Sequence, residues 1–298
     1  MNRRPVELRR TWLFVAGADA GALEQGPACG ADVLIQELED FTRPEDRPAA
    51  RALAASGLYD RWRASGALAA VRVNPLEDCG EEDLAAAMAG RPDVVMLPKV
   101  AGPEAVRRLA EAIAGHERRL GIPAGSTEIV PNVENARGLR DTFSICSADN
   151  RVVAVLLAAE DLAADLGCER TLDMAELDHA RQRFHVDCVA AGVLAIDLPY
   201  TWVDPAGARR HAESARRTGY RAKSAVDPAH VPGVNEVFTP QPAALAAARR
   251  IVTAFERARR NGASRVEVDG IEVEVPIYRN AQATIARAEA LASWARRD

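Results

Sequence analysis

Short apolar runs alternate with longer amphipathic stretches along most of the chain. Eight runs rich in Val, Ile and Leu are separated by segments rich in Ala, Arg and Glu. The runs are residues 11–17, 33–39, 68–74, 94–100, 127–134, 152–161, 193–200 and 221–227, and the last is the least apolar. Continuous apolar runs are typical of buried parallel strands, and strands that alternate with helices are typical of α/β folds. Eight such units predict an α/β fold, the (β/α)8 TIM barrel.

The segments between the runs have helical character. Residues 102–121 and 173–192 are examples, and we expect Gly192 to cap the second one. The alternative fold is an open doubly wound sheet. The turn after the first run, "VAGADAG" (residues 15–21), lacks the G-x-G-x-x-G pattern of dinucleotide-binding sheets, so this alternative is disfavoured.

The last 63 residues have a different pattern. A long helix is predicted at 240–262, and alternating Val and Ile around Asp269-Gly270 indicate a hairpin with a type I′ turn, followed by a final helix. This tail is too small to bury a core of its own, so it must pack on the barrel or on another subunit. We therefore expect a catalytic barrel domain at 1–235 and a helix, hairpin and lid segment at 236–298.

Composition narrows the range of partners. The chain has 298 residues, 48% of them hydrophobic, a net charge of −5 and a pI near 5.7. No overall positive field draws it to nucleic acid or to an anionic membrane. The five cysteines are scattered without metal-binding spacing, and neither a signal-peptide core nor an apolar run of 18 residues is found. We expect a cytoplasmic protein.

Polar residues at the carboxyl ends of the apolar runs are the main candidates for chemistry, because TIM-barrel active sites form there. The candidates are Glu37, Glu39, Asp40, Arg72, Asn74, Lys99, Glu134, Asn135, Glu160 and Asp161.

Several of these candidates are carboxylates, and converging carboxylates need a compensating cation. Oxygen ligands without nearby His or Cys suit Mg²⁺, so we assign Glu134 and Asp161 as its ligands. The alternative is that each of the two caps the following helix or pairs with an arginine.

Basic residues at these ends are candidates for binding anions. Arg72 lies inside an apolar run and could grip a substrate carboxylate or a developing oxyanion, or else form an ion pair with Glu37 or Glu39. Only Lys99 and Lys223 are lysines among 38 basic residues. Lys99 could form a Schiff base, but a carboxylate-rich site favours an electrostatic role. The three histidines that we expect to be solvated are His116, His179 and His211.

Several motifs together resemble a known family. They are "RRTWLFVAG", "GADVLIQELEDFTRPEDRPAAR", "VRVN", "MLPKV", "IVPNVENARGL", "AAEDLAADLG" and "GVNEVFTPQP", in this order and over nearly the whole chain. The chain is similar to the citrate lyase β-subunit-like branch of the HpcH/HpaI aldolase superfamily, which includes malyl-CoA and citramalyl-CoA lyases. The resemblance implies a Mg²⁺-dependent barrel enzyme that cleaves or condenses a β-hydroxyacyl-CoA thioester such as malyl-, citramalyl- or citryl-CoA by a retro-Claisen route.

The resemblance also implies roles for residues. The metal ligands of the family fall on Glu134 and Asp161 and its substrate-gripping arginine on Arg72. Its CoA-binding segment falls on Arg9, Arg10 and Phe14, with Arg51 nearby, and Lys99 is a further substrate-binding candidate. The tail corresponds to a segment that covers the active site of a neighbouring subunit in homotrimers or hexamers. Glu274 would be the acid or base that it delivers, and Glu37 would belong to the catalytic set.

The chain departs from the family pattern at several positions. Glu37 and Glu274 replace aspartates, Phe41 replaces a small residue, Ala158 a glycine and Asp227 a histidine. These departures keep two other functions open: an acyl-CoA thioesterase with the same metal, and a non-catalytic CoA-binding or regulatory paralogue. An aldolase acting on free 2-oxoacids is disfavoured, because the family branch with that activity has a histidine after the second strand and "ELEDFT" has none.

Overall fold

The computed structural model describes residues 3–295, and the chain divides into two compact units, Met1–Asn235 and Glu236–Asp298. The strands are β1 (Thr11–Ala16), β2 (Val33–Glu37), β3 (Leu68–Arg72), β4 (Val94–Leu97), β5 (Glu128–Val133), β6 (Ala154–Leu157), β7 (Leu194–Asp197), β8 (Ala222–Ala225), β9 (Val266–Val268) and β10 (Ile271–Val273). The α-helices are α1 (Ala20–Gln25), α2 (Arg47–Ala54), α3 (Leu58–Ala64), α4 (Glu81–Gly90), α5 (Pro103–Leu120), α6 (Ala136–Arg140), α7 (Thr142–Cys146), α8 (Glu160–Leu166), α9 (Asp178–Ala190), α10 (Pro205–Arg217), α11 (Val231–Phe238), α12 (Pro242–Arg260) and α13 (Val275–Ala295).

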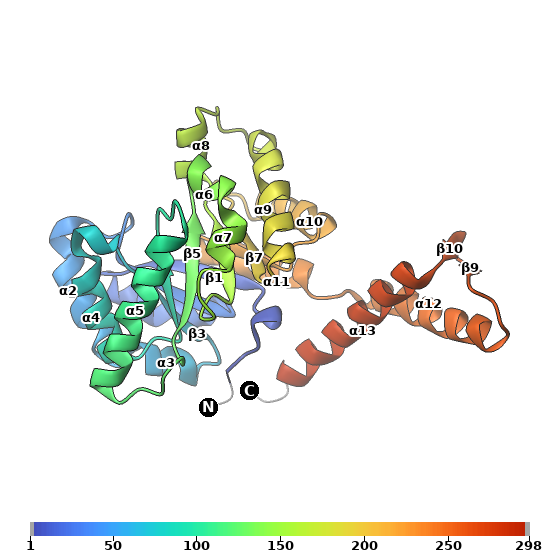
Figure 1. Ribbon diagram of the computed structural model, residues 1–298, viewed down its shortest axis with the longest axis horizontal. Coiled ribbons are helices and arrows are strands. Elements are labelled where there is room, and N and C mark those ends of the chain that lie inside the picture. The colour runs from blue at the N-terminus through green and yellow to red at the C-terminus, as the bar shows by residue number, and fades with distance from the viewer. Residues whose placement is uncertain (1–2, 296–298) are drawn as a thin grey trace. The chain divides into compact units, whose positions relative to one another are not determined.

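The first unit is a closed parallel barrel. Strands β1 to β8 follow one another around it in sequence order, and β8 pairs with β1 through the register Thr11↔Lys223. Helices such as α5, α7 and α9 cover the outside of the strands (Figure 1). The predicted (β/α)8 barrel is therefore confirmed, including a strand in the least apolar run, and the doubly wound sheet is excluded.

The helices begin and end where the local sequence favours it. Helix α9 stops just before Gly192, whose φ of 71° is in the left-handed region that glycine adopts most easily, as expected from the sequence. Asn135 and Asp204 cap α6 and α10 by accepting hydrogen bonds from backbone N–H groups. Across residues 3–295, no helix has the length and apolar character needed to span a membrane.

Alternate strand residues point into the barrel. The inward-facing core consists of Trp12, Phe14, Val33, Ile35, Leu68, Ala70, Val94, Met96, Val130, Ala154, Leu156, Ile196 and Ala222. Because side chains along a strand alternate between its two faces, Glu37, Arg72 and Glu134 lie on the same inward-facing rows as Ile35, Ala70 and Val130. These polar side chains therefore follow directly above the apolar interior, at the carboxyl ends of the strands.

Ion pairs lie at the amino ends of the strands. Arg9, just before β1, donates two hydrogen bonds to the carboxylate of Glu128, the first residue of β5, at 2.5 and 3.0 Å. Arg10 pairs with Asp32, just before β2, with N–O distances of 2.9 Å. These contacts tie the start of β1 to two other strands.

The second unit is a helical hairpin with a small sheet. Helices α12 and α13 pack against each other, with the rings of Phe255 and Tyr278 stacked at 4.7 Å. Strands β9 and β10 pair antiparallel across Asp269 and Gly270, whose φ angles of 52° and 78° are both positive, as a type I′ turn requires. The predicted hairpin and final helix are confirmed. The role of this unit as a lid stays a prediction.

Candidate active site

The carboxyl ends of β2 to β5 bring four predicted side chains together. Glu37 and Arg72 are register partners at the ends of β2 and β3, and Lys99 and Glu134 follow β4 and β5. The turn after β1 packs closely against the end of β2. Only glycine fits at position 17, because a Cβ there would lie 2.3 Å from the carbonyl oxygen of Glu37. The site is thus built on adjacent, mutually paired strands, which fixes its side chains better than loops would.

Arg72 is buried between acids and aromatic rings. Its Nε donates to Glu37 Oε1 at 2.9 Å, and its Nη2 lies 3.2 Å from Glu39 Oε2. The guanidinium carbon is 4.9 Å from the ring centroid of Phe14 and 5.8 Å from that of Phe41. Both alternatives considered for Arg72 are compatible with this geometry, since Nη1 has no partner among the described residues and can still bind an anion.

Both carboxylate oxygens of Glu37 accept hydrogen bonds within the protein. Its Oε1 accepts hydrogen bonds from Arg72 and from the backbone N–H of Glu39, and its Oε2 accepts from the N–H of Phe41 at 2.6 Å. The carboxylate therefore fixes both the arginine and the turn that follows β2. These contacts give Glu37 a positioning role for Arg72, and its place in the catalytic set stays a prediction.

Lys99 is held as a cation. Its ammonium group forms an ion pair with Glu39 and lies 3.5 Å from Asp40. Partial burial opposes ionisation, but the hydrogen bond and charge of Glu39 outweigh it and raise the pKa of Lys99 above its ordinary value. A lysine that keeps its proton is a poor Schiff-base nucleophile, so this geometry agrees with the electrostatic role.

Glu134 lies in a place that opposes its ionisation. Burial raises its pKa to about 8, although Arg72 and the N–H of Lys99 favour the charged form, and the charges of Glu39 and Asp161 raise the pKa further. Its Oε1 accepts a hydrogen bond from the N–H of Lys99, while its Oε2 is buried without a partner. A cation is the group that would satisfy this oxygen.

Asp161 is available as a second ligand. It lies in the first turn of α8, is exposed, and makes neither a capping hydrogen bond nor an ion pair within residues 3–295. The alternative of a structural role for this aspartate is therefore not realised.

The donor set around Glu134 fits a magnesium ion. Two cations, Arg72 and Lys99, face carboxylates on Glu37, Glu39, Glu134 and Asp161. The described residues contain no group of three or more His, Cys, Asp or Glu side chains arranged for a metal. A site with two carboxylates leaves the other coordination positions to water and substrate oxygens, which is the common arrangement for Mg²⁺.

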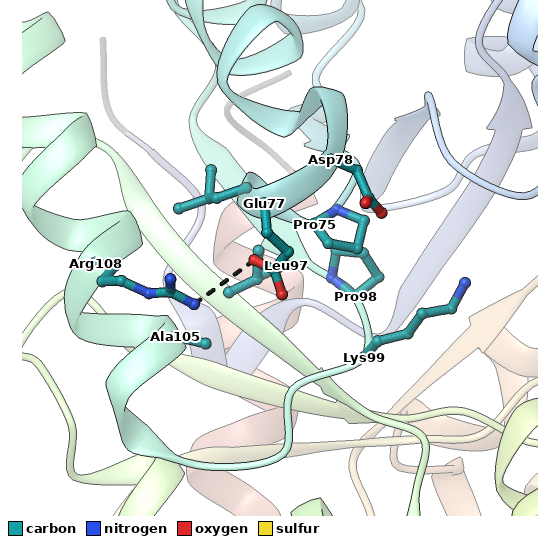
Figure 2. Close-up of a pocket in the computed structure, with 9 residues that line it drawn as sticks. Pro75, Glu77, Asp78, Leu97, Pro98, Lys99, Ala105 and Arg108 are labelled. Atoms are coloured by element: carbon teal, nitrogen blue, oxygen red, sulfur yellow. Dashed lines mark ion pairs between the residues drawn. The ribbon is translucent and has the colours of Figure 1, made fainter.

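A pocket opens beside this site. It has a volume of about 210 Å³, and Figure 2 shows Lys99 on one side and Arg108, paired with Glu77, on the other. Its walls also include Pro75, Leu76, Asp78, Leu97, Pro98 and Ala105. The pocket therefore combines apolar walls with two cationic side chains and two carboxylates, one of which pairs with Arg108.

Three arginines that the resemblance assigns to CoA binding form ion pairs within the protein. Arg9 and Arg10 are at the amino ends of the strands, the end of the barrel opposite Arg72, and their charges are used in the ion pairs described above. Arg51 on α2 pairs with Asp83 at 2.7 Å and with Glu82, both on α4. Each guanidinium thus neutralises a carboxylate, and the assignment of the three arginines to CoA binding stays a prediction.

The other candidates divide between site and scaffold. Phe14 belongs to the site, beneath Arg72. Asn74 binds Asp83 and the carbonyl of Leu38, and Asn135 caps α6, so both stabilise loops. Glu160 is tied to Arg170 and Thr201.

Glu274 lies in the second unit, directly after β10, with Arg265 at 3.9 Å. Its role as acid or base stays a prediction.

Sequence reasoning missed a second buried polar cluster. His211, expected to be solvated, is 6% exposed and contacts Lys223, which in turn binds Asp197. The helix that carries His211 is rich in charged residues, and this concealed the burial of one face. Two signals were present in the sequence: Asp197 ends an apolar strand, and Lys223 is one of only two lysines.

Curated relatives match the chain over nearly its full length. The citrate lyase subunit beta of Leuconostoc mesenteroides subsp. cremoris is 30% identical over 95% of this chain and 94% of its own. The (3S)-malyl-CoA thioesterase of Cereibacter sphaeroides is 30% identical over 96% of both chains. The mitochondrial citramalyl-CoA lyase of Homo sapiens is 28% identical over 95% of this chain and 86% of its own.

Solved structures and a family model agree with these relatives. Protein CitE from Mycobacterium tuberculosis, crystallised with magnesium, acetoacetate and coenzyme A, superposes with a TM-score of 0.77 at 28% identity, covering 94% of this chain and 98% of that one. The model of the HpcH/HpaI aldolase/citrate lyase family matches residues 10–228. The chain therefore belongs to the HpcH/HpaI aldolase/citrate lyase family.

Proposed function

We propose that the protein is a magnesium-dependent carbon–carbon lyase that cleaves or forms a β-hydroxyacyl-CoA thioester. The observation that carries this proposal is the buried, unpartnered Oε2 of Glu134, close enough to Asp161 for the charge of the aspartate to raise the pKa of Glu134. The support from relatives is the citramalyl-CoA lyase and the CitE complex with magnesium and coenzyme A.

The residues of this chain would hold the metal and the substrate. Glu134 and Asp161 would bind Mg²⁺, and the Nη1 of Arg72 would bind the oxygen on which negative charge develops. When bound, the ion supplies Lewis-acid polarisation of substrate hydroxyl and carbonyl oxygens. Glu37 keeps the guanidinium in position, and the rings of Phe14 and Phe41 exclude water from it, which strengthens its interaction with an anion.

The reaction proposed for cleavage is a retro-Claisen step. A base removes the proton of the β-hydroxyl group, the carbon–carbon bond breaks, and the bonding electron pair passes to the thioester as an enolate. Protonation of the enolate then gives the shorter acyl-CoA, and the other product is a 2-oxoacid. We assign the proton transfers to Glu274, supplied by the tail, because both oxygens of Glu37 are engaged.

The pocket beside Lys99 is our candidate for part of the CoA chain. Its apolar walls suit the pantetheine arm, and Arg108 at its edge suits a phosphate. The pocket is also on the same side of the barrel as Glu134, since Lys99 lines it and donates its N–H to that carboxylate.

A thioesterase is the second candidate. The similarity to (3S)-malyl-CoA thioesterase is as high as that to citrate lyase subunit beta, at 30% identity. Hydrolysis would use the same metal-binding carboxylates and the same arginine, and it would differ in admitting a water molecule to the thioester.

An assay with two readouts separates these functions. Purified protein with Mg²⁺ is mixed with malyl-, methylmalyl-, citramalyl- and citryl-CoA, and both 2-oxoacid and free thiol are measured. We expect 2-oxoacid without thiol. Thiol as the only new product would establish a hydrolase instead, and neither product from any substrate would favour a non-catalytic paralogue.

A further inference from the structure

A second polar cluster lies between the barrel and its helices, on β7 and β8. Because Ile196 and Ala222 face the barrel interior, their neighbours Asp197 and Lys223 point outward, toward α9 and α10. Asp197 accepts two hydrogen bonds from Arg181 of α9, at 2.9 and 3.1 Å, and one from Lys223 at 2.8 Å. Arg181 also pairs with Asp178 at 3.1 Å, so two cations face two carboxylates, and Asp197 and Lys223 are fully buried.

Lys223 determines the tautomer of His211. Its ammonium group has three protons and three acceptors: the carboxylate of Asp197, the carbonyl of Leu198 and the Nδ1 of His211 at 2.7 Å. Burial lowers the pKa of Lys223 to about 8, partly opposed by Asp197, so the lysine is still protonated at pH 7. His211 Nδ1 is therefore an acceptor, and the ring proton is on Nε2.

His211 Nε2 is a buried donor without a partner. It lies on the other side of the ring from Lys223, and the residue is only 6% exposed. Burial and the nearby charge of Lys223 lower the pKa of His211 to about 2. The ring therefore stays neutral at pH 7. A buried N–H without an acceptor costs about 1–3 kcal/mol, and a ligand that supplies one would recover that energy.

His211 is one of the residues that line a pocket of about 400 Å³, a volume within the usual range for small-molecule sites. The other walls are Leu172, Asp173, Tyr200, Asp204, Gly207, Arg210 and Ser214. The two acids in this set are already engaged: Asp204 caps α10 and pairs with Arg210, and Asp173 accepts from Thr171 and the N–H of Ala175. The groups that can recognise a ligand are the N–H of His211, the hydroxyls of Tyr200 and Ser214, and the guanidinium of Arg210, which is largely exposed and lies 3.3 Å from Asp204.

We propose that this pocket, between residues 172–173 and α10, is a second ligand site that binds a small carboxylic acid with an apolar body. The carboxylate accepts from His211 Nε2, after a small shift of the ring, and pairs with Arg210. The apolar body lies against Leu172 and Tyr200. The guanidinium of Arg210 favours an anion over a neutral group at this position.

This site is distinct from the metal site. Its residues belong to β7, β8, α10 and the segment after α8, whereas the metal-binding carboxylates follow β5 and β6. Glu160, next to Asp161 in sequence, bonds to Thr201 and Arg170, and the guanidinium of Arg170 stacks on Trp202 at 5.0 Å. The proposal therefore does not depend on the reaction assigned above.

The test uses sodium benzoate and the imidazole nitrogens of His211. The full chain is labelled with ¹⁵N-histidine, and the ring signals are recorded during a benzoate titration at pH 7, with His211→Phe to assign them. We expect the free protein to show a protonated Nε2, and the Nε2 signal to move with saturation as benzoate binds. An unprotonated Nε2 would overturn the proposal because no buried donor would then exist, and a signal that stays unmoved at high benzoate concentration would overturn it because benzoate would not bind at His211.

Two further comparisons identify the place and the chemistry. Ser214→Leu fills the pocket without changing the contacts of Lys223, and we expect it to weaken benzoate binding about tenfold or more. Arg107→Gln, on the exposed face of α5, is the matched control and should not change it. Equal binding to Ser214→Leu, or equal affinity for benzamide and benzoate, would refute the assigned site or the preference for a carboxylate.

Discussion

Glu134 combines burial with neighbouring negative charge. In the metal-free protein its carboxyl group holds a proton up to a pH of about 8, whereas the same group in an unfolded chain loses it near 4.5. The folded state therefore binds this proton more tightly. The resulting stability is fully present below pH 4.5 and is lost as the pH rises through about 8.

We predict that Glu134→Gln removes this pH dependence. At pH 9 the metal-free variant should melt above the metal-free wild type, by about 2–4 °C for each kcal/mol gained, and at pH 4 the difference should disappear. Mg²⁺ should raise the melting temperature of the wild type and leave that of the variant unchanged. Scanning calorimetry with and without EDTA measures both effects, and equal stabilisation of the two proteins by Mg²⁺ would rule out Glu134 as a ligand.

The contacts of Arg72 depend on a planar guanidinium. We predict that Arg72→Lys keeps the fold, because a positive charge still faces Glu37 and Glu39, but lowers kcat/KM about a hundredfold because the second anion-binding nitrogen is lost. Arg107→Lys, an exposed pair with Glu104, is the control that should retain full activity. Steady-state kinetics at saturating Mg²⁺ measure kcat/KM for both variants. A wild-type kcat/KM for Arg72→Lys would contradict the proposed anion-binding role of Arg72.

At the residue scale, position within the strand was the informative property of the sequence. Arg72, Glu134 and Asp161 follow from the rule that polar residues at the carboxyl ends of barrel strands face the active site. The pairing partners did not follow: nothing in the sequence shows that Glu37 uses both oxygens on Arg72 and the backbone, or that Arg51 reaches α4. Such contacts depend on which helices become neighbours after the barrel closes.

One buried ion pair fastens α5 to the barrel. Glu117, near the end of this helix, accepts two hydrogen bonds from Arg151 at 2.9 and 2.6 Å and two from the N–H groups of Gly125 and Thr127. Burial alone would raise the pKa of Glu117, but these four donors lower it to about 2. The pair therefore holds together the end of α5, the loop before β5 and the residue that begins the approach to β6.

We predict that Glu117→Gln lowers the free energy of unfolding by about 3 kcal/mol at pH 7, because it leaves Arg151 partly buried without its countercharge. Since the pKa is lower in the folded state, the contribution is present above pH 4.5 and is lost as the pH falls through about 2. Urea unfolding at pH 7 and pH 3 should show a smaller difference from wild type at pH 3. Glu104→Gln, in an exposed pair on the same helix, should change stability by less than about 0.5 kcal/mol.

At the element scale the sequence was a good guide wherever a segment was strongly periodic. The eight strands and the end of α9 at Gly192 follow from local patterns alone. The buried face of α10 was missed because arginines surround His211 and Ala212, and local polarity outweighs a narrow apolar stripe in such a pattern. Burial of that face depends on packing against β7 and β8. The pattern of apolar and polar residues within the helix itself does not show this packing.

At the scale of the whole molecule, the predicted reach of the tail to a neighbouring subunit has a direct test. Glu134→Gln would be inactive but would carry an intact tail, and Glu274→Gln would carry an intact metal site. Random mixing of the two within homo-oligomers should restore activity to about a quarter of the wild-type level, since one site in four combines a normal barrel with a normal neighbouring tail.

Coexpression of the two variants with different affinity tags isolates the mixed oligomers for assay. If mixed oligomers form and stay inactive, the tail does not supply its acid across a subunit boundary. The composition of the chain could not decide this point, because the tail pattern predicts a hairpin and a helix without indicating what they cover.

The ion pairs of Arg9 with Glu128 and of Arg10 with Asp32 lie at the amino ends of the barrel strands. These pairs stabilise the amino ends of β1, β2 and β5 independently of the residues at the carboxyl ends of the strands. Residues at the carboxyl ends of the strands, such as Glu37, can then be substituted without loss of these ion pairs.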